Sequence, residues 1–393
     1  MSEPKLGFVR FVQIRDFDGD DYHTYIEDSP RWRHCNRDDV LIARYGASLG
    51  RILRGLEGAY NVALVKAIPL GGLERHFMYH LLRSDYFQAP LAALGARSAQ
   101  EGFNKGDLST ISVPLPPAAE QRAISEVLDP LDEKIYLNRR TNETLEGIAR
   151  AFFKSWFVDF DPVRANVEHG RSARAPSADL FPAGFEHSRE NLLPRGWSRG
   201  RLGDVAENIR AGVQPRDIQG ATPYIALEHI PRRSITLYDW SVADNVASNK
   251  SQFKRGEILF GKLRPYFHKV AVAPVDGVCS TDILVIGPKS QEWFSFSLLW
   301  ASSDEIIAHA DAVSTGTKMP RCNWHDLANF EIPIPPVGVA RAFDGTVRPM
   351  VEQMLAAVQE SRTLAALRDA LLPKLLSGEV RLHGAEREVA KAL

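Results

Sequence analysis

Two long stretches of the chain place apolar side chains at alternating spacings of four and three residues, one over 124–156 and the other over 343–375. Such spacing predicts α-helices whose apolar side chains form a narrow seam for a partner helix. Asn142 and Ser361 occupy the same position in the two seams, where a polar side chain is expected to fix the register of the pair. The predicted seam residues are Ile124, Leu128, Leu131, Ile135, Asn142, Leu145, Phe152, Phe343, Val347, Met350, Met354, Ser361, Leu364 and Leu371.

Two arrangements of these helices fit the pattern. Either each helix lies on its own domain, or the two helices pack on each other. Matched seams of equal length favour mutual packing, which is antiparallel if the two halves of the chain are related by a pseudo-two-fold axis. Pro130 and Pro349 stand at the same place in the two stretches and predict a kink in each helix or a delayed start of its regular part.

The pattern occurs twice because the chain is a tandem duplication. Residues 108–157 align without gaps on residues 327–376, and 11 of the 50 positions are identical, against roughly 3 expected from average residue usage. Upstream, DDVLIARYG (38–46) matches GEILFGKLR (256–264), and FVQIRDF faces YIALEHI. A period near 219 residues is too long for a solenoid, so each copy is expected to be a domain followed by a helix.

Each copy has the same predicted order of elements. Short β-like runs such as VLIARYG and EILFGKL come first, an amphipathic helical stretch follows, and a strand closed by prolines (ISVPLPP or FEIPIPP) ends the domain. The predicted fold class is therefore α+β (mixed α/β), with two pseudo-symmetric domains separated by two long helices that form an antiparallel coiled coil. We place the first domain at 1–118, the first helix at 119–158, a Pro-, Gly-, Ser- and Arg-rich linker at 159–194, the second domain at 195–337, the second helix at 338–378 and a polar tail, expected to fray, at 379–393.

The overall composition is that of an ordinary globular protein. The chain has 393 residues, 44% of them hydrophobic and 25% charged, which suits two or three domains. Cys35, Cys279 and Cys322 form no C-x-x-C pair, which makes a zinc ribbon improbable and indicates a reducing compartment. No 18-residue apolar run or long apolar N-terminal segment occurs, so we expect a cytoplasmic location.

Motifs that carry catalytic chemistry are missing from the sequence. There is no G-x-x-x-x-G-K-[ST] or G-x-G-x-x-G loop, no Asn-Pro-Pro or Asp-Pro-Pro followed by an aromatic residue, and no H-E-x-x-H. The acidic cluster Asp16, Asp18, Asp20 and Asp21 resembles a calcium loop only loosely, so a solvated turn is the favoured interpretation. We therefore expect no catalytic residue and no metal site, and no cofactor bound directly.

The formal net charge of −1 conceals a segregation of charge along the chain. Residues 189–270 contain 14 Lys and Arg against 8 Asp and Glu, whereas residues 271–360 contain 5 against 11. The basic stretch is interleaved with aromatic residues, and an Arg-rich stretch stands at the equivalent place in the first copy. A charge run alone is usually a solvated face, but its presence in equivalent parts of both copies favours nucleic-acid binding, since Arg suits bidentate guanine and phosphate contacts. The candidate DNA-binding residues are Gln13, Arg15, Arg31, Arg33, Arg44, Tyr45, Arg51, Lys105, Arg210, Gln214, Arg216, His229, Arg232, Arg233, Lys254, Lys262, Arg264, Tyr266, His268, Lys318 and Arg321.

Four segments carry a resemblance to a known family. They are ARAFFKSWFVDFDPVRAN (149–166), LPPAAEQRAI at the start of the first long helix, RGWSRGRLGDVAEN (195–208) and LLPKLLSGEVRL (371–382). Together with the duplicated plan, they make the chain similar to the specificity subunit of type I restriction–modification systems over nearly its whole length.

The resemblance implies a non-catalytic, DNA-reading subunit. It implies two target recognition domains, each reading one half of a bipartite sequence in double-stranded DNA, separated by paired long helices. It also implies that the helices dock two methyltransferase (modification) subunits, that restriction (translocase-nuclease) subunits join the larger assembly, and that S-adenosylmethionine, ATP and Mg belong to these partners. A helix over 131–157 would measure roughly 40 Å, close to the ~34 Å of one turn of B-DNA, so the pair is expected to act as a ruler.

The first copy departs from the family plan at its start. The second copy has GWSRGRLGDVAENIRAGVQPRD before YIALEHI, whereas the first copy begins almost directly at FVQIRDF, so roughly twenty residues of the expected first domain are absent. Either the start codon is misassigned, the gene is truncated, or the missing segment is dispensable, and we expect that in-frame upstream codons, if present, would improve folding. An alternative function follows, namely an assembly scaffold whose degenerate first domain no longer reads DNA; a self-contained restriction or modification enzyme is disfavoured by the missing motifs.

Overall fold

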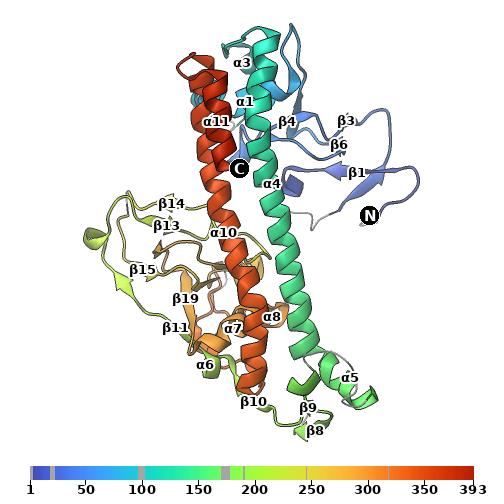
Figure 1. Cartoon of the computed structure of the whole chain (residues 1–393), viewed down its shortest axis with the longest axis vertical. Coiled ribbons are helices and arrows are strands. Elements are labelled where there is room, and N and C mark those ends of the chain that lie inside the picture. The colour runs from blue at the N-terminus through green and yellow to red at the C-terminus, as the bar shows by residue number, and fades with distance from the viewer. Residues whose placement is uncertain are drawn as a thin grey trace. The chain divides into compact units, whose positions relative to one another are not determined.

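The chain forms two compact units. The computed structural model describes residues 3–17, 23–95, 102–169, 178–188, 191–244, 246–316 and 318–393. Unit 1 contains Met1–Ile135 and Thr363–Leu393, and unit 2 contains Tyr136–Arg362. Each unit mixes strands and helices, as the predicted fold class requires. The two longest helices, α4 (Ala118–Phe153) and α10 (Val337–Leu376), each begin in one unit and end in the other, so neither is a segment separate from the domains (Figure 1).

Unit 1 contains two small sheets, in the orders β2-β1-β6-β3 and β5-β4-β7. Its strands are β1 (Phe8–Val12), β2 (Tyr25–Glu27), β3 (Arg33–Cys35), β4 (Val40–Ala43), β5 (Ile52–Leu53), β6 (Gly58–Tyr60) and β7 (Leu64–Ala67). Its helices, besides its parts of α4 and α10, are α1 (Arg75–Arg83), α2 (Asp85–Gly95), α3 (Lys105–Ser109) and α11 (Leu382–Ala392).

Unit 2 repeats this plan with additional strands. Its larger sheets have the orders β12-β15-β18-β13-β14 and β11-β19-β16-β17, and two pairs, β10-β20 and β8-β9, lie outside them. Its strands are β8 (Phe185–Ser188), β9 (Asn191–Pro194), β10 (Ser198–Arg201), β11 (Ala206–Asn208), β12 (Gly212–Val213), β13 (Pro223–Ile225), β14 (Ser241–Val242), β15 (Lys250–Phe253), β16 (Ile258–Gly261), β17 (Val270–Val272), β18 (Gly277–Cys279), β19 (Ile283–Pro288) and β20 (Glu331–Ile334). Its shorter helices are α5 (Asp161–His169), α6 (Leu202–Val205), α7 (Phe294–Ala301), α8 (Asp304–Ala312) and α9 (Trp324–Ala328).

The duplication inferred from the sequence is visible in strand register. The central antiparallel pair β4–β7 joins Val40 to Ala67, and the pair β16–β19 joins Ile258 to Ile286 at the equivalent place. The parallel pairs β1–β6 and β13–β18 also correspond. Both α3 and α9 begin with a capping box, formed by Asn104 with Asp107 and by Asn323 with Asp326. Equivalent residues therefore perform equivalent structural roles in the two units.

The long helices run antiparallel wherever they meet. In unit 1, a guanidinium nitrogen of Arg368 on α10 contacts Asp132 on α4; in unit 2, Asn138 Nδ2 donates to Ser361 Oγ at 3.2 Å and Asn142 Nδ2 to Met354 O at 3.2 Å. Residue numbers therefore increase along α4 as the numbers of their contact residues on α10 decrease, which is the mark of antiparallel helices. The predicted seam residues Ile124, Leu128, Leu131, Asn142, Phe343, Val347, Met354, Ser361, Leu364 and Leu371 are buried, and Ile135, Leu145 and Met350 are partly buried.

Phe152 lies differently from its predicted seam position. It is 36% exposed, while its neighbour Phe153 is buried and packs against Phe296, Trp300 and Phe343. An α-helix has 3.6 residues per turn, so a strict alternation of four and three drifts off the buried face by the end of a long helix. A π-helical turn, Lys154–Val158, follows directly and turns Trp156 and Phe157 into the same core.

The two prolines do not delay the long helices. α4 begins at Ala118 and continues through Pro130, and α10 begins at Val337 and continues through Pro349. Each amphipathic stretch, predicted as one helix, is divided into two. α1 and α2 are separated at Ser84, and α7 ends at Ala301, after which the Ser303 side chain caps α8. A hydroxyl that bonds the local backbone favours such breaks.

Two segments predicted to be irregular contain regular structure. Within the described part of the linker lie α5 and the β8–β9 hairpin, and Phe181 is buried in the core of unit 2. The C-terminal segment is helical: α11 buries Ala385 and Val389 against the helix pair of unit 1. The overlooked signal was the spacing of Leu382, Ala385 and Val389, which places all three on one face of a helix.

The proline-closed strand forms in only one copy. FEIPIPP contains β20, which pairs with β10. The equivalent residues of ISVPLPP form no strand within the described residues, and Val113 and Leu115 are 38% and 53% exposed. A strand needs a partner to satisfy its backbone, and the described part of unit 1 has no counterpart of β10.

Candidate nucleic-acid interface

Two loops of unit 2 meet and bring several predicted cations together. Leu263, after β16, forms an isolated β-bridge with Arg321, before α9. Arg264 N donates to Pro320 O at 2.8 Å, and the Arg264 guanidinium donates to Lys318 O at 3.2 Å. We name residues 262–268 and 318–321 the unit 2 junction. Its predicted DNA-binding residues are Lys262, Arg264, Tyr266, His268, Lys318 and Arg321.

The backbone of the unit 2 junction is strained and tightly held. Arg264 and His268 both have φ of 51°, in the left-handed region that bulky residues rarely adopt. Both backbone groups of Lys262 are hydrogen-bonded: its N–H donates to Asp282 O at 2.9 Å, and its carbonyl accepts from Cys322 N at 3.1 Å. Arg321 Nε lies 3.1 Å from Asp282 Oδ1. Strain of this kind persists only where surrounding contacts fix the loop, and it is concentrated at functional sites.

Aromatic residues extend the unit 2 junction. Tyr266 is 49% exposed, its ring centroid lies 4.6 Å from that of Phe267, and Arg232 lies over the Phe267 ring at 4.2 Å. An exposed ring beside guanidinium groups offers both a stacking surface and charge, which is the combination that nucleic-acid-binding surfaces use.

His268 has a structural position instead of an exposed one. It is 4% exposed, and its Nε2 lies 2.9 Å from Ser302 O. Burial lowers the pKa of His268 below its usual value, so the ring is neutral near pH 7. The prediction that His268 contacts DNA is wrong, because the sequence does not show whether the ring of a His in a basic stretch points outward or into the core.

Unit 1 has the equivalent junction with fewer cations. Tyr45 and Gly102 form the matching isolated bridge, and Arg44 Nε donates to Phe103 O at 2.7 Å with its guanidinium 5.0 Å from the Tyr45 ring. Tyr45 is 42% exposed. Gly46 and Gly102 stand where unit 2 has Arg264 and Arg321. We name residues 44–46 and 102–105, which include the exposed Lys105, the unit 1 junction.

A turn beside the unit 2 junction contains His229. Its Nδ1 accepts from Ala226 N at 2.9 Å, and the neighbouring Leu227 carbonyl accepts a hydrogen bond from Lys269 Nζ. Burial lowers the pKa of His229, and burial together with Arg232 lowers that of Lys269. Lys269 follows the junction directly in sequence, so this turn adjoins it.

The other predicted residues lie outside the two junctions. In unit 1, Gln13 N donates to Asp16 Oδ2 at 2.8 Å in the turn after β1, where exposed Arg15 also contacts Asp16. Lys254 lies before β16, at the end of the strand away from the unit 2 junction, and Arg233 pairs with Asp304 at 3.1 Å. The remaining members are exposed or partly buried on other segments, namely Arg31, Arg33, Arg51, Arg210, Gln214 and Arg216.

A buried network on α4 supports the unit 2 junction, and it was not predicted from the sequence. Glu146 accepts hydrogen bonds from Ser234 Oγ at 2.9 Å and Ile235 N at 3.1 Å, and it pairs with Arg150 at 2.8 Å. Arg150 in turn donates to Ser302 O, the carbonyl that His268 contacts. The long helix therefore fixes the unit 2 junction through polar contacts, and no periodicity rule marks such residues.

Unit 1 contains a buried ionic cluster between α1 and the helix pair. Asp132 lies 2.8 Å from Arg83 and also pairs with Arg368, while Asp129 accepts from His76 and His80 at 2.7 Å. Burial alone would raise the pKa of Asp132, but Arg83 and Arg368 outweigh it and hold the pKa below its usual value.

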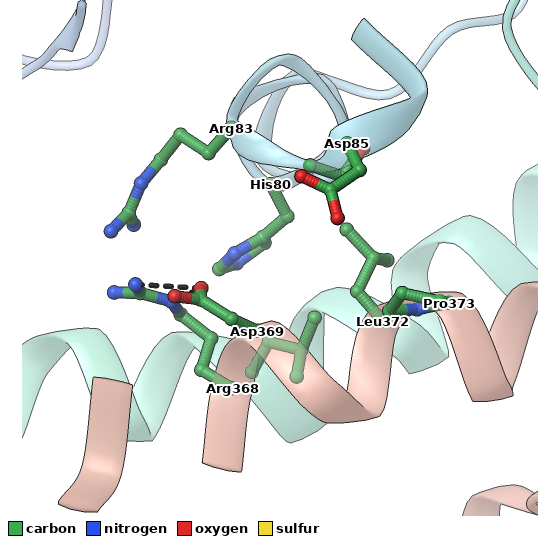
Figure 2. Close-up of a pocket in the computed structure, with 9 residues that line it drawn as sticks. His80, Arg83, Asp85, Arg368, Asp369, Leu372 and Pro373 are labelled. Atoms are coloured by element: carbon green, nitrogen blue, oxygen red, sulfur yellow. Dashed lines mark hydrogen bonds and ion pairs between the residues drawn. The ribbon is translucent and has the colours of Figure 1, made fainter. Parts of the chain in front are cut away.

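A small pocket lies beside this cluster. Its volume is about 120 Å³, and Figure 2 shows Arg83 and His80 from α1 pointing toward Arg368 and Asp369 of α10. The arginines are already engaged, since Arg83 pairs with Asp132 and Arg368 with Asp132 and Asp369. The pocket therefore belongs to the ionic contact between α1 and α10.

The cysteines and the acidic side chains provide neither an exposed thiol nor a metal site within the described residues. All three cysteines are buried, and burial raises the pKa of Cys279 to about 12 and that of Cys322 to about 11. Within the described residues, no group of three or more His, Cys, Asp and Glu side chains could hold a metal ion. Asp18, Asp20 and Asp21 of the predicted acidic turn lie outside the described residues. In the part of the chain described, no helix is long and apolar enough to cross a membrane.

Comparison with known proteins gives a consistent result. The model of the type I restriction modification DNA specificity domain matches residues 14–147 and again 194–339. The MjaIX specificity subunit of Methanocaldococcus jannaschii is 26% identical over 335 residues, covering 82% of this chain and 73% of that protein. The EcoDI specificity subunit of Escherichia coli is 28% identical over 359 residues, covering 87% and 78%. The crystal structure of a type I restriction–modification S subunit from M. genitalium has a TM-score of 0.48 at 15% identity, with 89% and 85% covered.

These findings define a class of protein that reads DNA by two repeated domains. The chain belongs to the type I restriction modification DNA specificity domain family. It is a specificity subunit, the DNA-recognition component of such a system, and it contains both copies of the domain.

Proposed function

We propose that the two junctions are the DNA-reading surfaces, each contacting one half of a bipartite target. The observation that carries this proposal is their equivalence: the same β-bridge, between the loop after the central strand and the loop before the capped short helix, occurs in both units. Predicted cations lie at both, with an exposed tyrosine at each.

The chemistry of the unit 2 junction suits this role. Lys262, Arg264 and Lys318 are positioned to contact phosphates, which sets register and orientation on the duplex. Arginine also reads guanine through two hydrogen bonds in the major groove, so Arg264 and Arg321 are the candidates for base contacts. The strained backbone at Arg264 holds its side chain in place before DNA binds, which reduces the ordering cost of association.

The partners proposed for this chain follow from its family. We propose that the antiparallel pair α4–α10 docks two methyltransferase subunits and that restriction/translocase subunits join the assembly. S-adenosylmethionine, ATP and Mg would be bound by those subunits, and none directly by this chain. The assembly would act in the cytoplasm, where its DNA target lies.

A second candidate function is supported by the composition of the unit 1 junction. Glycines at 46 and 102 replace the arginines of unit 2, so the first domain is the weaker DNA surface. In this alternative, the chain is an assembly scaffold in which only one domain retains readout.

The two candidates are distinguished by one pair of variants. Arg44→Ala with Tyr45→Ala removes the unit 1 junction side chains, and Lys262→Ala with Arg264→Ala removes those of unit 2. If both domains read DNA, each variant relaxes the sequence requirement of a different half-site in selection of bound DNA fragments. If only the second pair changes DNA selection, the scaffold alternative holds; if neither pair changes it, the proposed surfaces are wrong.

A further inference from the structure

Met319 is an exposed apolar residue within the basic unit 2 junction. It is 49% exposed, and the cations next to it in sequence, Lys318 and Arg321, are exposed as well. Single apolar side chains are common on protein surfaces and need no explanation by themselves. Met319 differs from such residues because its backbone is held in place by contacts from two directions.

The first set of contacts closes the turn on which Met319 stands. Thr315 and Arg321 form an antiparallel bridge, with a backbone hydrogen bond of 3.0 Å in each direction. Gly316 has φ of 106°, and a Cβ there would lie 3.2 Å from Met319 O, so the turn depends on glycine at this position. The two ends of the turn are therefore fixed to each other.

The second set of contacts comes from Arg264, in the other loop of the unit 2 junction. Its N–H donates to Pro320 O at 2.8 Å, and its guanidinium donates to Lys318 O at 3.2 Å. The carbonyls on both sides of Met319 thus accept hydrogen bonds from one residue. A side chain on a backbone fixed in this way is already positioned before a ligand binds, so less ordering opposes the contact that it makes.

Thymine is the base whose edge suits an apolar side chain. In the major groove every base pair presents hydrogen-bond donors and acceptors, and thymine alone adds a methyl group, at C5. The major groove also admits a two-stranded β-ribbon, and the turn of Met319 connects two segments that pair at Thr315 and Arg321. An apolar residue presented between cations can therefore read the methyl group while its neighbours contact phosphates.

We propose that Met319 is a specificity-determining residue that contacts the 5-methyl group of a thymine in the half-site read by unit 2. The inference rests on the proposed DNA-reading role of the unit 2 junction. The thioether end of Met319 covers the methyl group and excludes water from it, which favours an A·T pair at one position of the half-site. Arg264 and Arg321 supply hydrogen bonds to other positions.

The test uses the full chain assembled with its partner subunits and duplexes that contain its target. In the half-site that Lys262→Ala with Arg264→Ala relaxes, each thymine is replaced in turn by deoxyuridine, which lacks only the 5-methyl group. We expect one replacement to weaken binding of the unchanged chain about fourfold, which corresponds to the loss of about 0.8 kcal/mol for one buried methyl group. Met319→Ala is expected to bind the thymine and deoxyuridine duplexes equally well.

Two further variants act as controls. Met319→Leu keeps an apolar side chain and is expected to retain a preference for thymine at the same position. Leu180→Ala, at a residue that is 41% exposed and outside the unit 2 junction, is expected to keep the full preference. Neither Met319→Ala nor Leu180→Ala is expected to lower the thermal midpoint, because both side chains are already exposed.

The proposal would be overturned by a half-site without a specified A·T pair, by the absence of any deoxyuridine effect, or by an equal effect in Met319→Ala and the unchanged chain. Failure of the proposed function looks different. If Lys262→Ala with Arg264→Ala leaves DNA selection unchanged, the unit 2 junction does not read DNA at all. If that pair relaxes one half-site while the deoxyuridine effect is absent, only the role of Met319 is wrong.

Discussion

Residues of similar type in the same basic stretch differ in the direction of their side chains, because the backbone orients each one separately. Arg264 and His268 stand four residues apart and share the same left-handed φ, yet Arg264 reaches the carbonyl of Lys318 while His268 turns into the core. Composition and local charge predicted that the basic stretch is functional. They could not separate these two residues, because side-chain direction is set by a turn whose contacts come from distant segments.

We expect Arg264→Ala to weaken binding to a cognate duplex by about 1–3 kcal/mol, roughly tenfold to hundredfold, as for loss of one specific arginine contact. Its backbone φ suits alanine no better and no worse than arginine, so the thermal midpoint is expected to stay unchanged. Arg387→Ala, at an exposed position on α11, is the matched control and should bind normally. Titrations at two salt concentrations check the result; equal affinities for the two variants would contradict it.

Asp132 makes unit 1 sensitive to acid. Its pKa is held below the ordinary value of 3.8 by Arg83 and Arg368, and that of Asp129 is held below the same value by His80 and His76. Stability from both carboxylates is therefore fully present above about pH 4 and is lost as the pH falls through the lowered pKa values. Thermal unfolding followed from pH 6 to pH 2.5 should show a falling midpoint, and Asp132→Asn should flatten the acid part of the curve. An unchanged acid limb in that variant would show that Asp132 is not responsible.

The apolar periodicity predicted the two long helices and their buried faces. The residues at which the helices end depend on local contacts that periodicity does not report. The seam was predictable because burial of one face imposes a repeat over many turns of α4 and α10. The last turn of the α4 seam was predicted wrongly. The 3.6-residue period of an α-helix departs from the seven-residue repeat, and with the π-helical turn at Lys154–Val158 this brings Phe153 into the core in place of Phe152. α11 was overlooked because three apolar residues in a polar segment give a weak signal, although they suffice once a core lies beside them.

Truncation in the seam is expected to destabilise the helix pair. Leu128 is 0% exposed on α4, and Leu128→Ala should lower the free energy of unfolding by about 3 kcal/mol through lost burial and the cavity left behind. Leu137, on the same helix but 52% exposed, provides the control, and Leu137→Ala should change it by less than about 0.5 kcal/mol. Chemical denaturation of both variants measures the difference. Similar losses in the two would mean that Leu128 does not face the partner helix.

At the scale of the whole molecule, the duplication accounts for both the shared and the missing features. Equivalent registers place a junction in each unit, while the described part of unit 1 lacks counterparts of β10 and β11. The sequence predicted the two copies, the long helices and the family, because these depend on patterns that extend over many residues. It could not predict which cations gather, because that depends on a bridge between segments more than fifty residues apart, Leu263 and Arg321.

Each unit is proposed to read one half of a bipartite target through its junction. The most direct test is a genome-wide map of methylated adenines in cells carrying the chain with its partner subunits, compared between the unchanged chain and the variant Lys262→Ala with Arg264→Ala. We predict two short specified segments separated by an unspecified gap, with only one segment relaxed in the variant. A single contiguous motif, or equal relaxation of both segments, would show that the two units do not read separate halves of the target.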